Sequence, residues 1–270
     1  MSRHRVLITG ASAGLGAAFA RAYARAGASL VITARRADRL ERLAAELSAA
    51  HGTETLCVAA DLADPDAVAL VLERAQTGRR PVDILVNNAG YGLPGGWTHS
   101  DFPAQRAALE VMLTAPMHFC HACLPGMRAR GFGRILNIAS LAGLLPGGPG
   151  HTSYAAIKAA LIRFSQSLAA ECAGEGVRVL AVCPGLTYTE FHDVNATRAS
   201  LAGLPRFLWQ DADAVVAEAI AAAERPAAVR VTGRVNRLIA GASRLIPEGL
   251  LHGAASGVLA RVRTDARRRD

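Results

Sequence analysis

Long apolar runs are missing from the start of this sequence. After the basic stretch Met1–Arg5, an apolar run covers only Val6–Ile8, which is too short for the core of a signal peptide. We therefore expect a cytoplasmic protein. Past Val231, arginines and Pro247 interrupt every long apolar run, so we expect no transmembrane helix there.

Cysteines are few, and their pattern does not suit a disulfide framework. There are five, an odd number in apolar surroundings, which favours buried and reduced thiols. Cys120 and Cys123 form a single Cys-x-x-Cys pair with His118 and His121 beside it. A zinc site of this type needs a second pair at matching spacing, and none follows in a stretch that has a continuous helical pattern. We therefore predict no metal site.

Clustered positive charge is also scarce, although the formal net charge is +8. Arginines are scattered over many segments, and only Arg267–Arg269 form a contiguous run. No nucleic-acid-binding motif accompanies them, so we expect no nucleic-acid partner. A basic tail of this kind is usually a solvated terminus, although it would also suit acidic substrates or a membrane surface.

What the sequence has is a regular alternation of apolar segments. The chain is 270 residues long and 51% hydrophobic, enough for a large core. Short β-branched runs alternate with longer amphipathic runs, which is typical of parallel strands joined by helices. The predicted fold is α/β: a single-domain, Rossmann-like, doubly wound parallel sheet of about seven strands with helices on both faces. The expected strands are Val6–Thr9, Leu30–Ala34, Glu54–Ala59, Ile84–Asn87, Arg134–Ala139, Arg178–Cys183 and Val229–Thr232. The expected helices are Ala17–Ala26, Asp38–Ala50, Asp66–Gln76, Pro103–Arg130, Tyr154–Ala173 and Ala212–Glu224.

Two segments stand outside this alternation. Leu186–Gln210 contains glycine and proline and is predicted to be a long loop with short helical pieces rather than a sheet element, of the kind that often covers a ligand. We expect residues 1–233 to form the dinucleotide-binding and catalytic domain. Residues 234–270 are an amphipathic extension that Pro247 divides in two. In order of preference, we expect it to pack on the domain, to form a dimer contact, or to lie on a membrane surface as a peripheral attachment.

A glycine-rich turn follows the first predicted strand and opens the first predicted helix. Glycines permit positive φ and a close backbone approach, so the helix can offer free N–H groups and its dipole to a pyrophosphate. The context predicts a dinucleotide site. The residues assigned to it are Gly10, Ser12, Ala13, Gly14, Leu15 and Gly16.

The end of the second predicted strand indicates which nicotinamide cofactor is bound. A carboxylate there would accept hydrogen bonds from the 2′-hydroxyl of NAD. The position is Ala34, followed by Arg35 and Arg36. Guanidinium groups suit a 2′-phosphate, so NADP is favoured and NAD is less favoured. The alternative is that these arginines only solvate a loop.

Tyr154 and Lys158 stand four residues apart near the start of a predicted helix, so both project from one face. A phenol is a poor base at neutral pH, and we expect the nearby cation to lower its pKa into a working range. Ser140 ends the preceding strand and is placed to hydrogen-bond a substrate oxygen.

These motifs together resemble the classical short-chain dehydrogenase/reductase family over nearly the whole chain. The motifs that carry the resemblance are Thr9-Gly10-x-x-x-Gly14-x-Gly16, Asn87-Asn88-Ala89-Gly90, the strand end at Ser140, Tyr154-x-x-x-Lys158 and Pro184-Gly185. The resemblance implies that Tyr154 is the general acid/base and that Ser140 orients the carbonyl or alcohol. It implies that Lys158 lowers the Tyr154 pKa and holds the nicotinamide ribose. It also implies a dimer or tetramer formed through the two long middle helices.

The resemblance assigns further cofactor contacts. Asp61 and Leu62 are similar to the adenine-contacting segment, and Asn88, Ala89 and Gly90 to the floor beneath the cofactor. The turn at the nicotinamide end would include Pro184, Gly185, Thr187 and Thr189. From the residues alone, Asp61 would be a turn carboxylate and Pro184-Gly185 an ordinary turn.

One position departs from the family pattern. Members carry an asparagine in the long middle helix, where it helps to hold a water of the proton relay, and this sequence has Met112 there. A thioether is only a weak acceptor. The main hypothesis is an NADP-dependent carbonyl reductase or alcohol dehydrogenase. The alternative is an NADP-binding sensor or scaffold with weak or no turnover.

Substrate choice is expected to depend on Tyr91–Trp97, Leu141–Thr152 and Leu186–Gln210. Several large apolar side chains lie in these segments: Trp97, Phe191, Phe207, Leu208 and Trp209. They favour a hydrophobic carbonyl or secondary alcohol, such as a lipid, steroid, polyketide or aromatic ketone. Any one of them could instead belong to the core or to a subunit interface.

Overall fold

A seven-stranded parallel sheet forms the middle layer of the protein. The computed structural model describes residues 4–75, 80–93, 96–148, 150, 152–189 and 204–243. The strand order is β3-β2-β1-β4-β5-β6-β9, with every neighbouring pair parallel. This confirms the predicted doubly wound α/β fold. The strands are β1 (Arg5–Thr9), β2 (Ser29–Ala34), β3 (Thr55–Ala59), β4 (Ile84–Asn87), β5 (Gly133–Ile138), β6 (Val177–Cys183) and β9 (Val229–Val231).

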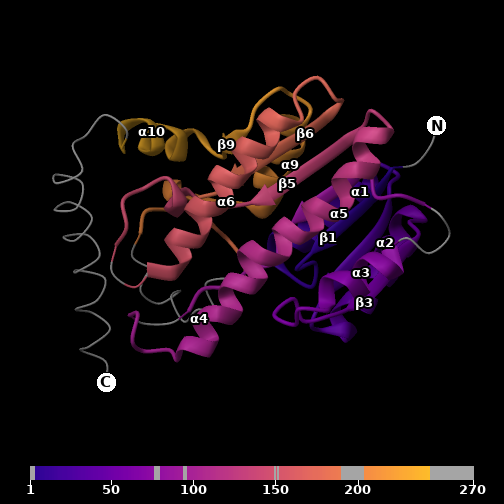
Figure 1. Ribbon diagram of the computed structural model, residues 1–270, viewed down its shortest axis with the longest axis horizontal. Helices are drawn as coiled ribbons and strands as arrows, with labels where there is room; N and C mark the ends of the chain where they lie inside the picture. The colour runs from indigo at the N-terminus through magenta and orange to yellow at the C-terminus, as the bar shows by residue number, and fades with distance from the viewer. Residues whose placement is uncertain are drawn as a thin grey trace.

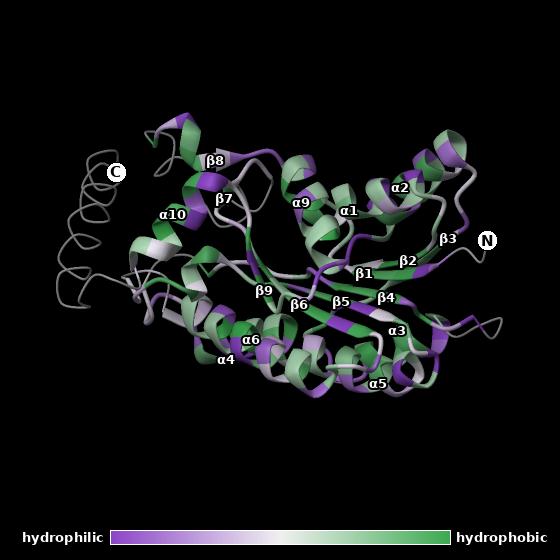
Figure 2. Cartoon of the chain, turned by 90° about the horizontal axis from the view of Figure 1, so that it is seen from above, coloured by the Kyte–Doolittle hydropathy of each residue, from purple (hydrophilic) through white to green (hydrophobic). Residues whose placement is uncertain are grey.

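Helices cover both faces of the sheet (Figure 2). One face carries α1 (Gly14–Arg25), α2 (Ala37–His51) and α9 (Ala212–Ala223). The opposite face carries α3 (Ala67–Ala75), α4 (Phe102–Leu109), α5 (Ala115–Ala129) and α6 (Thr152–Glu171).

The central strands are mostly apolar because both of their faces are buried. In β1, Leu7 packs into the core under α3 and α5, whereas Val6 and Ile8 pack into the core under α1 and α9. All three side chains are fully buried. Successive side chains of a strand point to opposite faces, so one short strand contributes to both cores.

The order of the strands places the functional motifs. β1 lies between β2 and β4, so the chain winds outward in both directions from β1 (Figure 1). Ligands of such sheets bind at this reversal, beyond the carboxyl ends of the strands. The glycine-rich turn after β1 and the Asn-Asn-Ala-Gly segment after β4 therefore meet at one crevice.

The middle helix is not the continuous α-helix that its pattern predicts. The five residues Glu110–Thr114 between α4 and α5 form a π-helical segment, η1, in which the Ala115 N–H donates to the Glu110 carbonyl. Pro116 follows at once, and it has no N–H to donate to the Met112 carbonyl, so regular α-helical bonding is interrupted there. Phe102–Ala129 as a whole is apolar and long enough to cross a membrane, but half of its most apolar window is buried inside the protein, as in the core helix of a globular domain.

The segment predicted as an irregular loop is partly a sheet. Its two ends, β7 (Leu186–Thr187) and β8 (Trp209–Gln210), pair in parallel, with the 3₁₀ turn η3 (Arg206–Leu208) before β8. The prediction of no sheet element was therefore wrong at the ends. A two-residue strand carries no periodicity that sequence alone could show. Phe191 lies outside the described residues.

The C-terminal extension begins as a helix. α10 (Arg234–Ser243) follows β9 directly and contacts β9 and η3. Residues 244–270, which include Pro247 and the basic tail, lie outside the described part of the chain.

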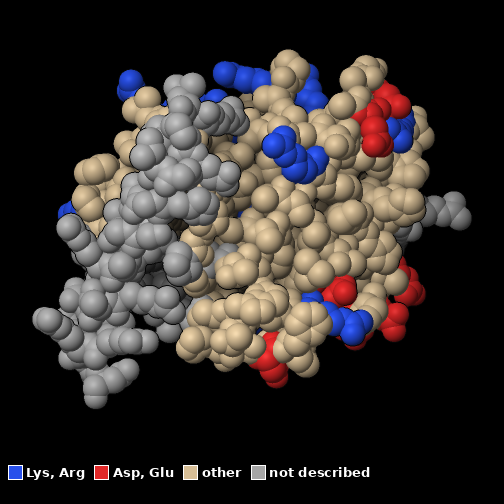
Figure 3. All heavy atoms as spheres, turned by 60° about the vertical axis from the view of Figure 1, so that its left-hand side comes forward, with Lys and Arg blue, Asp and Glu red and all other residues tan. Residues whose placement is uncertain are grey.

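Figure 3 shows the side of the molecule that lies to the left in Figure 1. Arginine side chains gather toward its upper margin, acidic ones lie to the right and below, and the described surface between them is largely uncharged.

Candidate active site

The glycine-rich turn forms a cradle that has room only for backbone. Gly10 and Gly14 adopt positive φ angles of 66° and 54°. A Cβ added at Gly10 would lie 2.8 Å from the Ala89 Cα, and one at Gly16 would lie 2.3 Å from the Gly10 carbonyl oxygen. The N-cap of α1 is Ala13, which makes no side-chain capping bond. The first N–H groups of α1 therefore remain available to an anion such as a pyrophosphate.

The segment after β4 is fixed against this cradle. The backbone N–H groups of Asn88 and Ala89 each donate to the Thr9 hydroxyl at 3.0 Å. The Asn88 side-chain amide donates to the carbonyls of Thr9, at 3.0 Å, and Gly10, at 3.2 Å. The two predicted motifs thus form one rigid wall of the crevice.

Arg36 and Arg35 extend from the end of β2 toward the same crevice. The Arg36 guanidinium donates to the Ser12 hydroxyl from Nη2 at 3.0 Å and from Nε at 3.3 Å, so it lies over the phosphate turn. The Arg35 guanidinium carbon lies 6.0 Å from the centre of the Tyr91 ring. Arg36 thus lies at the glycine-rich turn, and Arg35 lies toward the neighbouring Asn-Asn-Ala-Gly segment.

The predicted adenine segment is held by its own turn. The Asp61 carboxylate accepts a hydrogen bond from the Ala63 N–H at 3.1 Å. The Leu62 side chain is buried in the core under α3 and α5. Any contact from Leu62 to an adenine would therefore come from its backbone.

The three predicted catalytic side chains come together at the end of β5. The Ser140 hydroxyl caps the short turn η2 (Leu141–Gly143), accepting from the Ala142 N–H at 3.2 Å, and it is hydrogen-bonded to the Tyr154 phenol. The Lys158 Nζ lies 5.6 Å from the centre of the Tyr154 ring and donates to the Ile138 carbonyl at 2.7 Å. One hydroxyl, one phenol and one amine thus share a single site.

Burial controls the acidity of this group. Burial raises the pKa of Tyr154 to about 12, although the hydrogen bond with Ser140 opposes the shift. Burial also lowers the pKa of Lys158 to about 8. Burial therefore outweighs the expected lowering of the phenol pKa by the cation. Removal from water disfavours both charged forms more than the pair stabilises them.

Sequence reasoning missed a third buried group at this site. The Cys183 thiol, at the end of β6, interacts electrostatically with both Tyr154 and Lys158 and accepts a hydrogen bond from the Ser140 backbone. Burial raises its pKa to about 12, so it is a neutral thiol at physiological pH. A cysteine at a strand end has no signal of its own in one sequence.

Met112 lies behind the catalytic group. It is buried in η1 with 2% of its surface exposed. A Cβ added at Gly90 would lie 3.3 Å from the Met112 sulfur and 3.7 Å from the Lys158 Nζ. The side chain that departs from the family pattern therefore packs at the floor of the site, next to the lysine.

The turn assigned to the nicotinamide end is built from bonds with its neighbours. The Pro184 carbonyl accepts from the Leu141 N–H at 2.8 Å, and the Thr187 hydroxyl donates to the Gly185 carbonyl at 3.1 Å. A Cβ at Gly14 would lie 3.1 Å from that of Thr189. The structure thus brings the Pro184–Thr189 segment between the catalytic group and the start of α1.

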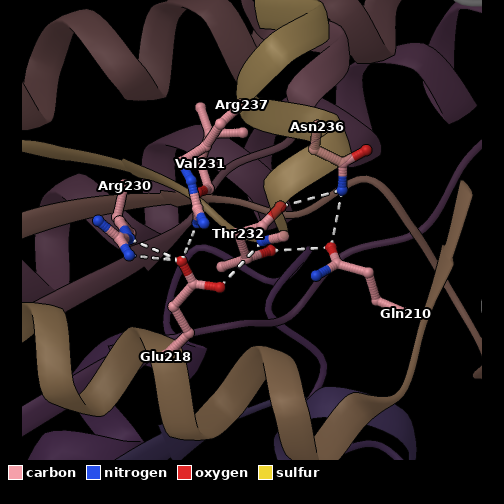
Figure 4. Close-up of polar contacts among 8 residues, drawn as sticks. Gln210, Glu218, Arg230, Val231, Thr232, Asn236 and Arg237 are labelled. Atoms are coloured by element: carbon pink, nitrogen blue, oxygen red, sulfur yellow. Dashed lines mark hydrogen bonds and ion pairs between the residues drawn. The ribbon is translucent and has the colours of Figure 1, made fainter.

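A network at the start of α10 supports this turn from outside (Figure 4). A Cβ at Gly185 would lie 2.5 Å from the Asn236 side-chain nitrogen. Glu218 of α9 binds the guanidinium groups of Arg230 and Arg237 and accepts from the Gly233 N–H at 2.9 Å. One carboxylate thus joins α9, β9 and α10. The sequence analysis assigned no role to it.

A pocket opens beside Tyr154. The predicted residues Tyr91, Leu93 and Trp97 line one wall. Phe207, Leu208 and Trp209 lie on η3 and β8 instead, where Trp209 stacks on Tyr188 with ring centres 4.8 Å apart. Sequence reasoning did not assign four other lining residues to the pocket: Gln105, Ala108, Met112 and Ser153.

Comparisons with known proteins agree with this arrangement. A family model described as short chain dehydrogenase matches residues 4–199. The chain is 38% identical over 183 residues to oxidoreductase UcpA of Escherichia coli (strain K12), covering 68% of this chain and 69% of that protein.

Two solved structures are similar over most of both chains. A short-chain dehydrogenase from Sphingobium yanoikuyae in complex with NADPH is 32% identical, with a TM-score of 0.75 over 90% of this chain and 94% of that one. A bulky-bulky ketone specific alcohol dehydrogenase from Comamonas testosteroni is 30% identical, with a TM-score of 0.75 over 91% and 94%.

Proposed function

Because the chain belongs to the short-chain dehydrogenase family and is an oxidoreductase, we propose that it transfers a hydride between NADP(H) and a hydrophobic ketone or secondary alcohol. One observation carries this proposal: Ser140, Tyr154 and Lys158 meet where the dinucleotide crevice opens into a pocket. A hydride donor and a proton donor can therefore face the same substrate.

The crevice fits a phosphorylated dinucleotide. The cradle of Gly10 and Gly16 admits no side chain, and the uncapped first turn of α1 offers N–H donors to a pyrophosphate. Arg36 over Ser12 would bind a 2′-phosphate. The similar structure in complex with NADPH supports the choice of NADP.

The chain's own residues would supply the proton chemistry. When bound, NADPH supplies the hydride. The Ser140 hydroxyl would hold the carbonyl oxygen, and the Tyr154 phenol would donate its proton to that oxygen as the hydride reaches the carbon. The raised pKa of Tyr154 keeps the phenol protonated at neutral pH. The phenol can therefore serve as the proton donor in the reduction of a ketone.

The pocket supports an apolar substrate. Leu93, Ala108 and Met112 line it beside Tyr91 and Trp97. Apolar walls with a few convergent polar groups are typical of small-molecule sites. The similar alcohol dehydrogenase that is specific for bulky-bulky ketones supports the same class of substrate.

A second candidate is an NADP-binding sensor or scaffold. The observation that favours it is Met112, which packs beside Lys158 at the position where the family pattern implies a relay asparagine. A thioether holds water poorly, so a bound cofactor need not be followed by rapid proton exchange.

We also propose that the protein is a dimer or tetramer. The middle helix exposes large apolar side chains: Phe102 is 69% exposed, Leu109 is 42% exposed and Met117 is 41% exposed. Apolar exposure of this kind on one helix supports pairing of two copies through it. Light scattering on the purified protein would test the oligomeric state, and a single monomeric species would contradict the proposal.

The test of function is turnover together with binding. Purified protein with NADPH and a series of hydrophobic ketones should consume reduced nicotinamide. Tyr154→Phe should lower kcat at least a hundredfold and leave the Kd for NADPH unchanged. If no ketone or alcohol changes the nicotinamide absorbance while NADPH still binds, the result favours an NADP-binding sensor or scaffold over an enzyme.

A further inference from the structure

Gln105 is a buried amide in the wall of the substrate pocket. It lies on α4, one turn before Ala108 and two turns before Met112, and only 7% of its surface is exposed. It lines the same pocket as Tyr154. Glutamine is rarely buried without hydrogen-bond partners, so the role of this side chain depends on which groups satisfy it.

The amide joins two segments that are distant in sequence. The Ser153 hydroxyl, next to Tyr154 in the first turn of α6, donates to the Gln105 carbonyl oxygen. The Gln105 amide nitrogen donates to the Ser100 hydroxyl at 2.6 Å and toward the Trp97 carbonyl at 3.5 Å. Gln105 thus bridges the segment that carries Trp97 and the helix that carries Tyr154.

These contacts satisfy the hydrogen-bonding groups of the Gln105 side chain. Both amide hydrogens have acceptors in the protein, and the amide oxygen has a donor. The amide is therefore poorly suited to bind a substrate carbonyl. It ties the segment that carries Trp97 to the first turn of α6, and both of these segments line the pocket.

We propose that Gln105 is a positioning residue that sets the width of the substrate pocket and so decides which ketone substituents reach Tyr154. The inference rests on the proposed function, because the pocket is taken as the ketone site. The hydrogen-bonded bridge between the Trp97 segment and α6 can be tested whether or not the protein turns over a substrate.

The first test is selectivity. Gln105→Leu keeps a similar volume and removes all three hydrogen bonds. We expect the ratio of kcat/KM for benzophenone to that for acetophenone to rise at least tenfold, with the Kd for NADPH unchanged. The matched control is Gln166→Leu on α6, whose amide oxygen accepts from the surface residue Arg163 at 3.0 Å. A general loss of stability would lower kcat/KM for both ketones by the same factor and leave their ratio constant.

The second test reads the bridge without turnover. The sequence has two tryptophans, so Trp209→Phe leaves Trp97 as the only one. Trp97 is 49% exposed. In that background, acrylamide quenching of Trp97 should be up to about twofold stronger in Gln105→Leu than in Gln166→Leu. Gln105→Glu should restore most of the protection, because a carboxylate accepts from both Ser100 and Ser153.

The outcomes separate the two proposals. If the unmodified protein reduces no ketone, the proposed function fails. The quenching experiment would still show whether Gln105 joins the Trp97 segment to α6. If Gln105→Leu matches its control in both selectivity and quenching, the inference is overturned. Should Gln105→Leu fail to fold, Ser153→Ala removes one end of the bridge, and unchanged selectivity and quenching in that variant would overturn the inference equally.

Discussion

Met112 lies against Gly90, where a Cβ would come within 3.3 Å of the methionine sulfur and 3.7 Å of the Lys158 Nζ. The residue is on the π-helical segment Glu110–Thr114. Segments of this kind are frequent at functional sites, because the extra residue re-aims a side chain within a helix. The position that departs from the family pattern is thus also the position where the helix is irregular.

The first prediction follows from that contact. Met112→Asn places an amide beside Lys158, where it can hold a water, and should raise kcat for ketone reduction about tenfold. The buried amide should cost roughly 1 to 3 kcal/mol of stability where it lacks partners. Steady-state kinetics and urea unfolding would measure both effects. Leu70→Asn, on the exposed side of α3, is the control. Equal kcat for wild type and Met112→Asn would show that the methionine does not limit proton exchange.

The fold could be predicted from the sequence because its signal is local. Parallel strands such as Ile84–Asn87 are buried on both faces and therefore read as continuous apolar runs. The glycine turn and the Tyr154–Lys158 pair likewise have fixed spacing within one element. All of these were found where they were expected.

The rest of the site depends on contacts between distant segments. Gln105 reaches Ser153 across 48 positions, and Cys183 meets Lys158 only once β5 and β6 are paired. The pKa of Tyr154 was predicted in the wrong direction because the cost of burial depends on the whole fold. No local pattern encodes such pairings.

The second prediction concerns cofactor choice. Arg36 lies over Ser12, with two donors at 3.0 and 3.3 Å. Arg36→Ala should raise the Kd for NADPH roughly ten- to a hundredfold, because charge-assisted hydrogen bonds contribute about 1.5 to 3 kcal/mol each. The Kd for NADH should hardly change. Arg42→Ala, which removes an exposed pair with Asp38 on α2, is the control for lost surface charge. An equal loss for both cofactors would contradict the 2′-phosphate role.

The third prediction concerns the phosphate cradle. Gly16→Ala would place a Cβ 2.3 Å from the Gly10 carbonyl oxygen and 2.6 Å from the Asn88 side-chain nitrogen. The Gly10 backbone cannot move away without distorting the glycine-rich turn. Binding of NADPH should therefore fall below detection in calorimetry. Gly241→Ala in α10, where a Cβ meets nothing within 4 Å, should bind NADPH as the wild type does. Normal binding by Gly16→Ala would mean that the cradle is not the phosphate site.

The fourth prediction concerns Glu218, which joins α9, β9 and α10. Burial alone would raise its pKa, but the Gly233 N–H and the guanidinium groups of Arg230 and Arg237 lower it overall. Glu218→Gln should cost about 2 kcal/mol in urea unfolding at neutral pH. A carboxyl with a lowered folded-state pKa stabilises above its ordinary value of 4.5 and loses that effect as the pH falls. The difference from wild type should therefore shrink in acid.

The control for that experiment is Glu73→Gln on the exposed face of α3, which should leave the free energy of unfolding unchanged. A difference between wild type and Glu218→Gln that is constant from neutral to acidic pH would show that the carboxylate charge is not what holds α10.

The last prediction uses a feature of composition: Lys158 is the only lysine in the sequence. Protein labelled with ¹³C-lysine therefore gives a single Cε resonance. Burial lowers the pKa of this amine from 10.5 to about 8, so the resonance should titrate with a midpoint near pH 8. Tyr154→Phe retains the burial and should keep the midpoint. A midpoint near 10.5 would show that water reaches the amine and that the site is not dry.

The same shift makes stability depend on pH. Between pH 8 and pH 10.5 the unfolded chain still carries the Lys158 proton after the folded chain has released it, so the free energy of unfolding rises with pH. Lys158→Met lacks this rise. Relative to that variant, the wild type should gain roughly 3 kcal/mol across the interval, since one pKa unit corresponds to about 1.4 kcal/mol. Groups shared by the two proteins, including Tyr154 and Cys183, largely cancel in the difference. A constant difference from pH 8 to pH 10.5 would mean that folding does not desolvate the lysine.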